Sequence, residues 1–187
     1  MKSLKFIPVL AMAFLVFACS PALPQKDVDA ATAAFTKAKQ DQADVYAADA
    51  FKAASDANDA LTANLAAKDY SNTKALAQAL LDASNKADSE VAAGIDQAKK
   101  DVAQLTTDVA AAKTLVSKEL LKAERAGRRA KVDVKKAKAD FAAATATADD
   151  QADVAAGKFG DARTKLTAEK AALTAIQQTL EAAGYKN

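Results

Sequence analysis

The sequence predicts an all-α fold, with long antiparallel helical hairpins packed as a coiled-coil-like helical bundle and no strands. Apolar residues recur at spacings of three and four along most of the chain, which is the period of one helix face. β-branched residues are sparse and never alternate over a useful length, so strand signals are absent. The 187 residues include 52 alanines and no tryptophan. The core must therefore be thin, which suits long helices packed side by side better than a globule with a deep pocket.

Residues 1–18 are interpreted as a lipoprotein signal peptide. Lys2 and Lys5 precede the apolar run 6–17, which is too short for a membrane span of about 20 residues and leads directly to Cys19. The segment resembles a bacterial lipobox, and Cys19 is the single cysteine of the chain. We therefore expect Cys19 to be the lipid attachment site. An ordinary secretory signal peptide is the alternative, because Val16 and Ala18 also suit the general signal peptidase.

A lipid on Cys19 would make a membrane the first partner of this protein. Acyl chains such as palmitate contribute about 0.8 kcal/mol per buried methylene, so two or three would anchor the chain almost permanently. Ser20 stands where aspartate would signal retention in the inner membrane of enterobacteria. By that resemblance we expect a cell-envelope protein, anchored by lipid to the outer membrane and facing the periplasm. Without residues 1–18 the chain has 24 basic and 24 acidic residues, so net charge indicates no partner.

The first part of the chain predicts a short tether, residues 19–26, and an alanine-rich helical domain, residues 27–90. Asp27 or Asp29 is expected to cap the first helix. A turn expected at residues 46–49 separates this helix from a second one, and a second turn, with Asp69, is expected at residues 66–72. The apolar stripes of the two helices comprise Val28, Ala31, Phe35, Ala38 and Val45, and then Phe51, Ala54, Leu61 and Leu65.

The remaining domain, residues 91–187, is expected to form one or more long helical hairpins with coiled-coil character. An unbroken helix over residues 71–126 would span roughly 84 Å at 1.5 Å per residue. Its heptads could pack on the chain's own return helix or on another molecule, and self-association stays open. The seam residues are Ile95, Ala98, Val102, Leu105, Val109, Ala112 and Val116.

Residues 118–138 form the one marked charge run, with nine basic and three acidic residues. Gly127 favours a hairpin bend inside this run. One interpretation is contact with anionic lipid or lipopolysaccharide phosphates. The alternative is a solvated helix tip with local pairs such as Glu119–Lys122 or Glu124–Arg128. No aromatic residues interleave the positive charges, so nucleic acid is not expected as a partner. The residues expected to meet an anionic surface are Lys122, Arg125, Arg128, Arg129 and Lys131.

The chain is expected to return through a helix carrying Val134, Phe141 and Ala148. A turn at 157–161 follows, with Asp161 as the cap of a last helix that Gly184 ends. The residues 66–70 and 155–159 resemble each other at an offset of 89, which predicts two helical hairpins of similar design. The last helix is expected to bury Leu166, Leu173, Ile176 and Leu180.

Catalytic chemistry is not indicated. The chain has no histidine, which removes the usual general base and the commonest metal ligand. Asp149, Asp150 and Asp153 are interpreted as a solvated acidic face rather than a cation site. Five single glycines form no phosphate-binding loop. We therefore expect no enzyme, no cofactor and no metal site.

The segment 27–90 resembles an alanine-rich helical domain family of unknown function found in Gram-negative and spirochaete envelope lipoproteins, although Ala48 stands where that family commonly has proline. The resemblance implies a periplasmic helical module, distantly similar to tetratricopeptide hairpins, without catalytic residues. The residues that carry it are Tyr46, Ala47, Phe51, Ala54, Ala57, Lys68, Asp69, Tyr70, Ala75, Ala77, Ala79 and Ala83.

The function expected from these patterns is that of a lipid-anchored helical lipoprotein of the cell envelope, with a structural or protein-interaction role. Its partners would be the membrane, through Cys19, and envelope proteins or a second copy. The alternative is a periplasmic binding module that holds a peptide or an acyl chain in an interhelical groove near Phe35, Phe51 and Tyr70.

Overall fold

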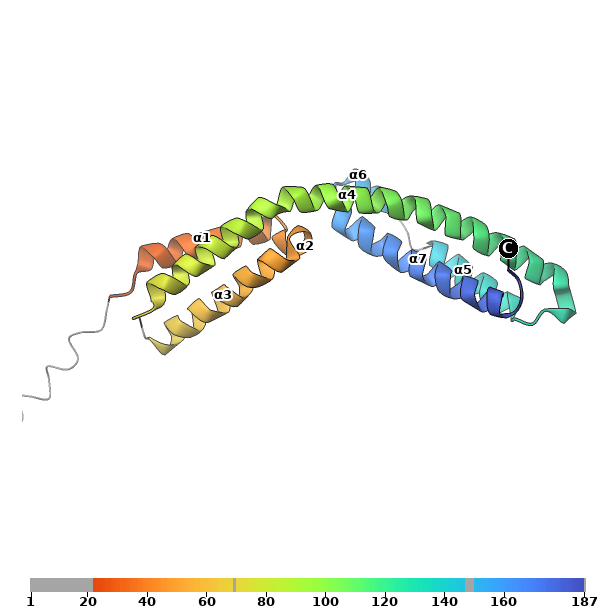
Figure 1. Ribbon diagram of the computed structural model, residues 1–187, viewed down its shortest axis with the longest axis horizontal. Coiled ribbons are helices and arrows are strands. Elements are labelled where there is room, and N and C mark those ends of the chain that lie inside the picture. The colour runs from red at the N-terminus through yellow and green to blue at the C-terminus, as the bar shows by residue number, and fades with distance from the viewer. Residues whose placement is uncertain (1–21, 69, 147–149, 187) are drawn as a thin grey trace, which may run out of the picture. The chain divides into compact units, whose positions relative to one another are not determined.

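The computed structural model describes residues 22–68, 70–146 and 150–186, and its regular elements are all helices (Figure 1). None of the described residues forms a strand, so the predicted all-α class is confirmed. The predicted signal peptide and Cys19 lie outside the described residues. The elements are α1 (Gln25–Gln40), α2 (Ala43–Tyr46), α3 (Ala48–Ala67), α4 (Thr73–Ala126), the 3-10 helix η1 (Gly127–Arg129), α5 (Val134–Ala146), α6 (Asp150–Ala155) and α7 (Phe159–Ala182).

The chain divides into two compact units, residues 1–91 and 92–187, which we call unit 1 and unit 2. Helix α4 contributes residues to the cores of both units. It is continuous from Thr73 to Ala126, as its uninterrupted heptad pattern predicts, and Gly94 is accommodated inside it. Each unit is described by itself below.

In unit 1, α1 and the first part of α4 run in one direction and α3 runs in the other (Figure 1). The predicted stripes on α1 and α3 meet α4 in one apolar cluster, and the rings of Phe35 and Phe51 stack with centroids 5.5 Å apart. At the α3–α4 turn, the buried Thr73 hydroxyl donates to Asn64 Oδ1 at 2.6 Å. The buried residues of this cluster are Val28, Ala31, Phe35, Ala54, Leu61, Ala77 and Leu80.

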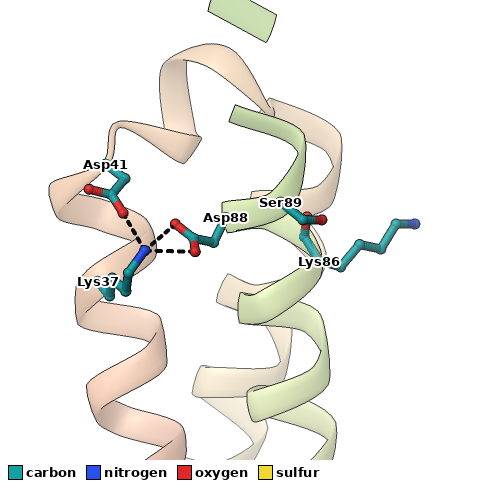
Figure 2. A network of polar contacts seen from close by, with 5 residues as sticks. All are labelled: Lys37, Asp41, Lys86, Asp88 and Ser89. Carbon is teal, nitrogen blue, oxygen red and sulfur yellow. Dashed lines mark hydrogen bonds and ion pairs between the residues drawn. The ribbon is translucent and has the colours of Figure 1, made fainter. Parts of the chain in front are cut away.

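A lysine on α1 ties that helix to α4 in unit 1. Figure 2 shows the Lys37 ammonium between Asp41, at the end of α1, and Asp88 of α4. It donates to Asp41 Oδ2 at 2.6 Å and to the two Asp88 oxygens at 2.8 and 2.7 Å. These hydrogen bonds raise the pKa of Lys37, and the bond from Lys37 lowers the pKa of Asp41 from 3.8. On the neighbouring turn of α4, Ser89 Oγ donates to the backbone oxygen of Lys86.

In unit 2, α4 and α7 run parallel to each other, and α5 runs in the opposite direction (Figure 1). Two ion pairs fix this alignment, Arg163–Asp101 at 3.4 Å and Lys170–Asp108 at 2.6 Å. Both pairs join residues 62 positions apart, so the register stays constant over a heptad. The predicted α4 seam therefore packs within its own chain. The cluster contains Val102, Val109, Val116, Leu120, Ala123, Ala137, Ala162, Leu166, Leu173, Ile176 and Leu180, including all four residues expected to be buried on the last helix.

A carboxylate occupies one position of the α7 seam. Glu169 lies between Leu166 and Leu173 at seam spacing, and its side chain is 1% exposed. Its Oε1 lies 2.7 Å from Lys113 Nζ of α4, without the alignment of a hydrogen bond, so the contact is mainly an ion pair. Lys113 therefore compensates a charge that would otherwise be costly to bury.

The predicted echo at an offset of 89 residues is present in the structure. Lys68 and Gly157 both have positive φ, at 56° and 75°, and each is followed two residues later by an aromatic residue. The next helix then buries side chains in the same register. The buried positions are Thr73, Ala77, Leu80, Ser84, Ala87 and Val91 on α4, and Ala162, Leu166, Glu169, Leu173, Ile176 and Leu180 on α7.

Two helix starts differ from expectation. Neither Asp27 nor Asp29 caps α1, because the helix already begins at Gln25 and Pro24 occupies the N-cap position; residues 25 and 26 of the expected tether are therefore helical. Likewise, α7 begins at Phe159 with Lys158 at the N-cap, and Asp161 lies in its first turn. Asp27 and Asp161 still suit the positive ends of their helices.

Two helices predicted from the sequence are interrupted in the structure. Val45 is not part of the buried stripe but 40% exposed, because left-handed Gln42 interrupts the helix after Gln40 and changes the register, so that Ala43 is buried instead. The expected return helix consists of α5 and α6, and Ala148 lies outside the described residues.

The Lys37 contacts predict a pH-dependent stability of unit 1. The pKa of Asp41 is lower in the folded than in the unfolded protein. The contribution of Asp41 to the free energy of unfolding is therefore fully present above pH 3.8, and it is lost as the pH falls through the pKa of the folded state. We expect Lys37→Met to lower the urea midpoint of unfolding at pH 7. Below the folded pKa of Asp41, the urea midpoints of this variant and of wild type should be equal. Circular dichroism gives the midpoints. Lys26→Met, at an exposed lysine of the same helix, is the control, and an equal effect there would contradict the assignment.

The Glu169–Lys113 pair predicts a difference between breaking and replacing a buried charge. Lys113→Met should cost about 1–3 kcal/mol of unfolding free energy, less than for a fully buried pair because the Lys113 side chain is 38% exposed. Lys113→Met/Glu169→Leu should return to within about 1 kcal/mol of wild type. Urea denaturation measures both, with Lys100→Met as control. A double variant no more stable than Lys113→Met would contradict this account.

Candidate functional site

The predicted lipid site precedes the described residues. Description begins at Ala22, and α1 begins at Gln25, six residues after Cys19. Six residues of chain can span at most about 20 Å. A lipid on Cys19 would therefore hold the start of α1 within about that distance of the attachment point.

The turn between α4 and α5 is built by local backbone geometry. Helix α4 ends at Ala126, and Gly127 has φ 54°, a conformation that favours glycine. The predicted bend at Gly127 is thus confirmed. The Ala130 amide donates to the Gly127 carbonyl at 3.1 Å, and Asp133 Oδ1 accepts the Lys136 amide at 2.9 Å at the start of α5. The chain therefore reverses direction inside the basic run.

This turn collects the five cations that the sequence singled out. The last turns of α4 carry Lys122 and Arg125, η1 carries Arg128 and Arg129, and Lys131 lies two residues after η1. All five side chains are exposed. We call Lys122, Arg125, Arg128, Arg129 and Lys131 the basic turn.

The acidic residues of the run are directed elsewhere. Glu124 pairs with Lys138 of α5 at 2.6 Å, so the expected Glu124–Arg128 pair is wrong, and Glu119 lies buried in the core. Among the described residues, no carboxylate forms an ion pair with any member of the basic turn. The positive charges of the turn are consequently not neutralised by the bundle that carries them.

The C-terminal residues support the basic turn. Past α7, the Tyr185 ring packs against the unit 2 core, and its hydroxyl accepts a hydrogen bond from the Lys131 amide at 3.2 Å. Lys122 Nζ donates to the backbone oxygen of Lys186 at 2.7 Å. Sequence patterns did not indicate this role for Tyr185, because the contact joins residues 54 positions apart.

Two other sites were expected from the sequence, a ligand groove near Phe35 and Phe51 and an acidic face around Asp153. The stacked rings of Phe35 and Phe51 fill space between α1 and α3, where a ligand groove was expected, and Tyr70 lies half-buried at the next turn. Asp153 pairs with Lys165 at 2.6 Å, and Asp149 lies outside the described residues. Within the described ranges, no cluster of three His, Cys, Asp or Glu residues could hold a metal ion.

Grooves are present in unit 2. One of about 470 Å³ is lined by α4, α6 and the start of α7, with Val102, Val154 and Phe159 on its walls. Another of about 350 Å³ lies between α5 and α7. Lys99 Nζ lies 5.5 Å from the centroid of the Phe159 ring at the first groove. These grooves are open and largely apolar.

A comparison of the chain with protein families, curated proteins and solved structures found no match. No helix in the described part of the chain is both long and apolar enough to span a membrane.

The Tyr185 contact predicts a local change in backbone protection. Tyr185→Phe keeps the ring but removes the acceptor of the Lys131 amide, so we expect that amide to exchange its hydrogen roughly two- to fivefold faster. Hydrogen–deuterium exchange followed by NMR measures it. The Ala130 amide, which bonds to Gly127, is the internal reference. Equal exchange of the Lys131 amide in both proteins would contradict the contact.

Proposed function

We propose that this protein is a lipid-anchored helical lipoprotein of the cell envelope, held by acyl chains on Cys19, with a structural or protein-interaction role. The observation that carries the proposal is the basic and then apolar N-terminal pattern that leads directly to the single cysteine. Ser20, which stands where aspartate would signal retention in the inner membrane, supports an outer-membrane location facing the periplasm.

The chemistry of the lone cysteine supports an anchor. An exported chain meets an oxidising compartment, where a single free thiol is open to mispairing. A thioether-linked lipid on Cys19 would leave no thiol. At about 0.8 kcal/mol per buried methylene, two or three acyl chains would make the attachment effectively permanent.

The form of the described units supports a scaffold rather than a catalyst. Their cores consist mainly of apolar seam residues on long helices, and the stripe residues include many alanines that allow close packing. The surfaces offered are exposed helix faces and open grooves. Such surfaces suit contact with envelope proteins, with a second copy or with a membrane.

Lipidation is tested by labelling cells that express the full chain with a palmitate analogue. Wild type should carry the label and sediment with membranes, whereas Cys19→Ala should lose the label and the membrane attachment at high salt. Ser20→Ala is the matched control and should remain labelled. An unlabelled wild-type protein in the soluble fraction would overturn the proposal, and separation of the two membranes by density would test the location.

A further inference from the structure

The distribution of arginine distinguishes the basic turn from every other charged part of the chain. The sequence contains 22 lysines and only four arginines. Three of the four, Arg125, Arg128 and Arg129, lie within five residues of one another at this turn. The fourth, Arg163, pairs with Asp101. Arginine and lysine have similar helix propensities, so the cluster is not explained by helix formation.

Guanidinium groups offer a chemistry that ammonium groups lack. The planar fork of arginine donates two parallel hydrogen bonds to one phosphate, whereas lysine acts as a point charge. In the described ion pairs the cation is lysine, as at Lys37, Lys136 and Lys138, with Arg163 as the one exception. A concentration of exposed arginines therefore indicates recognition of phosphate-like anions rather than solubility.

The arginines are also available and supported. Their side chains are exposed, and no described carboxylate pairs with them. The backbone beneath them is fixed by Gly127 at positive φ and by the contact between Lys131 and Tyr185. Preorganisation of this kind lowers the entropic cost of binding.

An apolar side chain among the cations points to a membrane surface as the partner. Leu121 is 51% exposed, which makes it the most exposed large apolar side chain among the described residues. On α4 it lies three residues after Lys118 and four before Arg125, so these residues share one helix face. A leucine flanked by cations suits the boundary between lipid headgroups and acyl chains. Nucleic acid would instead favour stacking aromatics, which this face lacks.

We propose that the basic turn, together with Lys118 and Leu121, docks on a bilayer surface that carries anionic phosphate headgroups. The three guanidinium groups would bind headgroup phosphates, the lysines would add electrostatic attraction, and Leu121 would enter the interfacial region. This docking is a second, reversible membrane contact. It deepens the proposed envelope function but does not require the lipid on Cys19.

Arginine footprinting tests the docking on the full chain. Phenylglyoxal modification, read by mass spectrometry, is measured with excess phosphatidylglycerol vesicles and with phosphatidylcholine vesicles. We expect the anionic vesicles to slow modification of Arg125, Arg128 and Arg129 several-fold, and 0.5 M salt to abolish the effect. Arg163 is the internal reference. Equal rates with both vesicles, or protection by soluble polyphosphate but not by vesicles, would overturn the proposal.

Substitution gives an independent test, performed in a Cys19→Ala full chain so that no lipid contributes. Arg125→Gln/Arg128→Gln/Arg129→Gln should lower the partition coefficient onto phosphatidylglycerol vesicles about 100-fold, from the typical contribution of each cation near an anionic surface. The control Lys74→Gln/Lys100→Gln/Lys158→Gln removes the same charge from exposed positions elsewhere and should change it less than about threefold. Equal losses would overturn the site.

Two further measurements separate the loss of guanidinium groups from the loss of positive charge and from a loss of helical structure. Arg125→Lys/Arg128→Lys/Arg129→Lys keeps the charge, and we expect several-fold weaker binding than wild type; equal binding would overturn the guanidinium role. Circular dichroism of each variant should show unchanged helicity. Because these arms omit the lipid, loss of palmitate labelling and loss of docking can occur separately, so failure of the anchor and failure of the docking are distinguishable.

Discussion

The interaction on which both units depend is the packing of the α4 seam against other helices of its own chain. In unit 1 the seam presents Ala77 and Leu80, and in unit 2 it presents Val102, Val109 and Val116. With 52 alanines in the chain, most core positions contribute little apolar area. The few leucines, valines and phenylalanines at seam spacing must therefore supply most of the hydrophobic stabilisation, and each helix has to keep its heptad register to bring them together.

Polar residues inside the seams explain how the register is kept. At the offset of 89 residues, Leu80 of α4 corresponds to Glu169 of α7, and Ser84 corresponds to Leu173. Glu169 is compensated in unit 2 by Lys113, so a shift of α7 by one heptad would bury a carboxylate away from its cation. The Asp101–Arg163 and Asp108–Lys170 pairs favour the same alignment at the edge of the seam. Apolar packing alone would tolerate such a shift better, because alanine-rich layers resemble one another.

The charges of the chain serve two different purposes. Most of the cations in the described salt bridges hold helices together or pair within one helix, and these cations are almost all lysines. The basic turn departs from this use, because the bundle buries Glu119 and pairs Glu124 with α5. The proposed docking and the proposed lipid on Cys19 would use different physics. One is electrostatic and weakened by salt, and the other is hydrophobic and insensitive to it.

The sequence by itself determined the helical class, the extent of α4, the bends at Gly127 and Gly157, and the buried face of α7. These features depend on local periodicity and on glycine conformations, which a single segment reveals. It also identified the five cations of the basic turn. Tertiary structure decided that Glu124 pairs with Lys138 rather than with an arginine of the basic turn, that α7 runs parallel to α4, and that Tyr185 supports Lys131. These are contacts between residues far apart in the chain, and no local pattern encodes which partner a side chain meets. The predicted role of Cys19 stays a conclusion from the sequence alone.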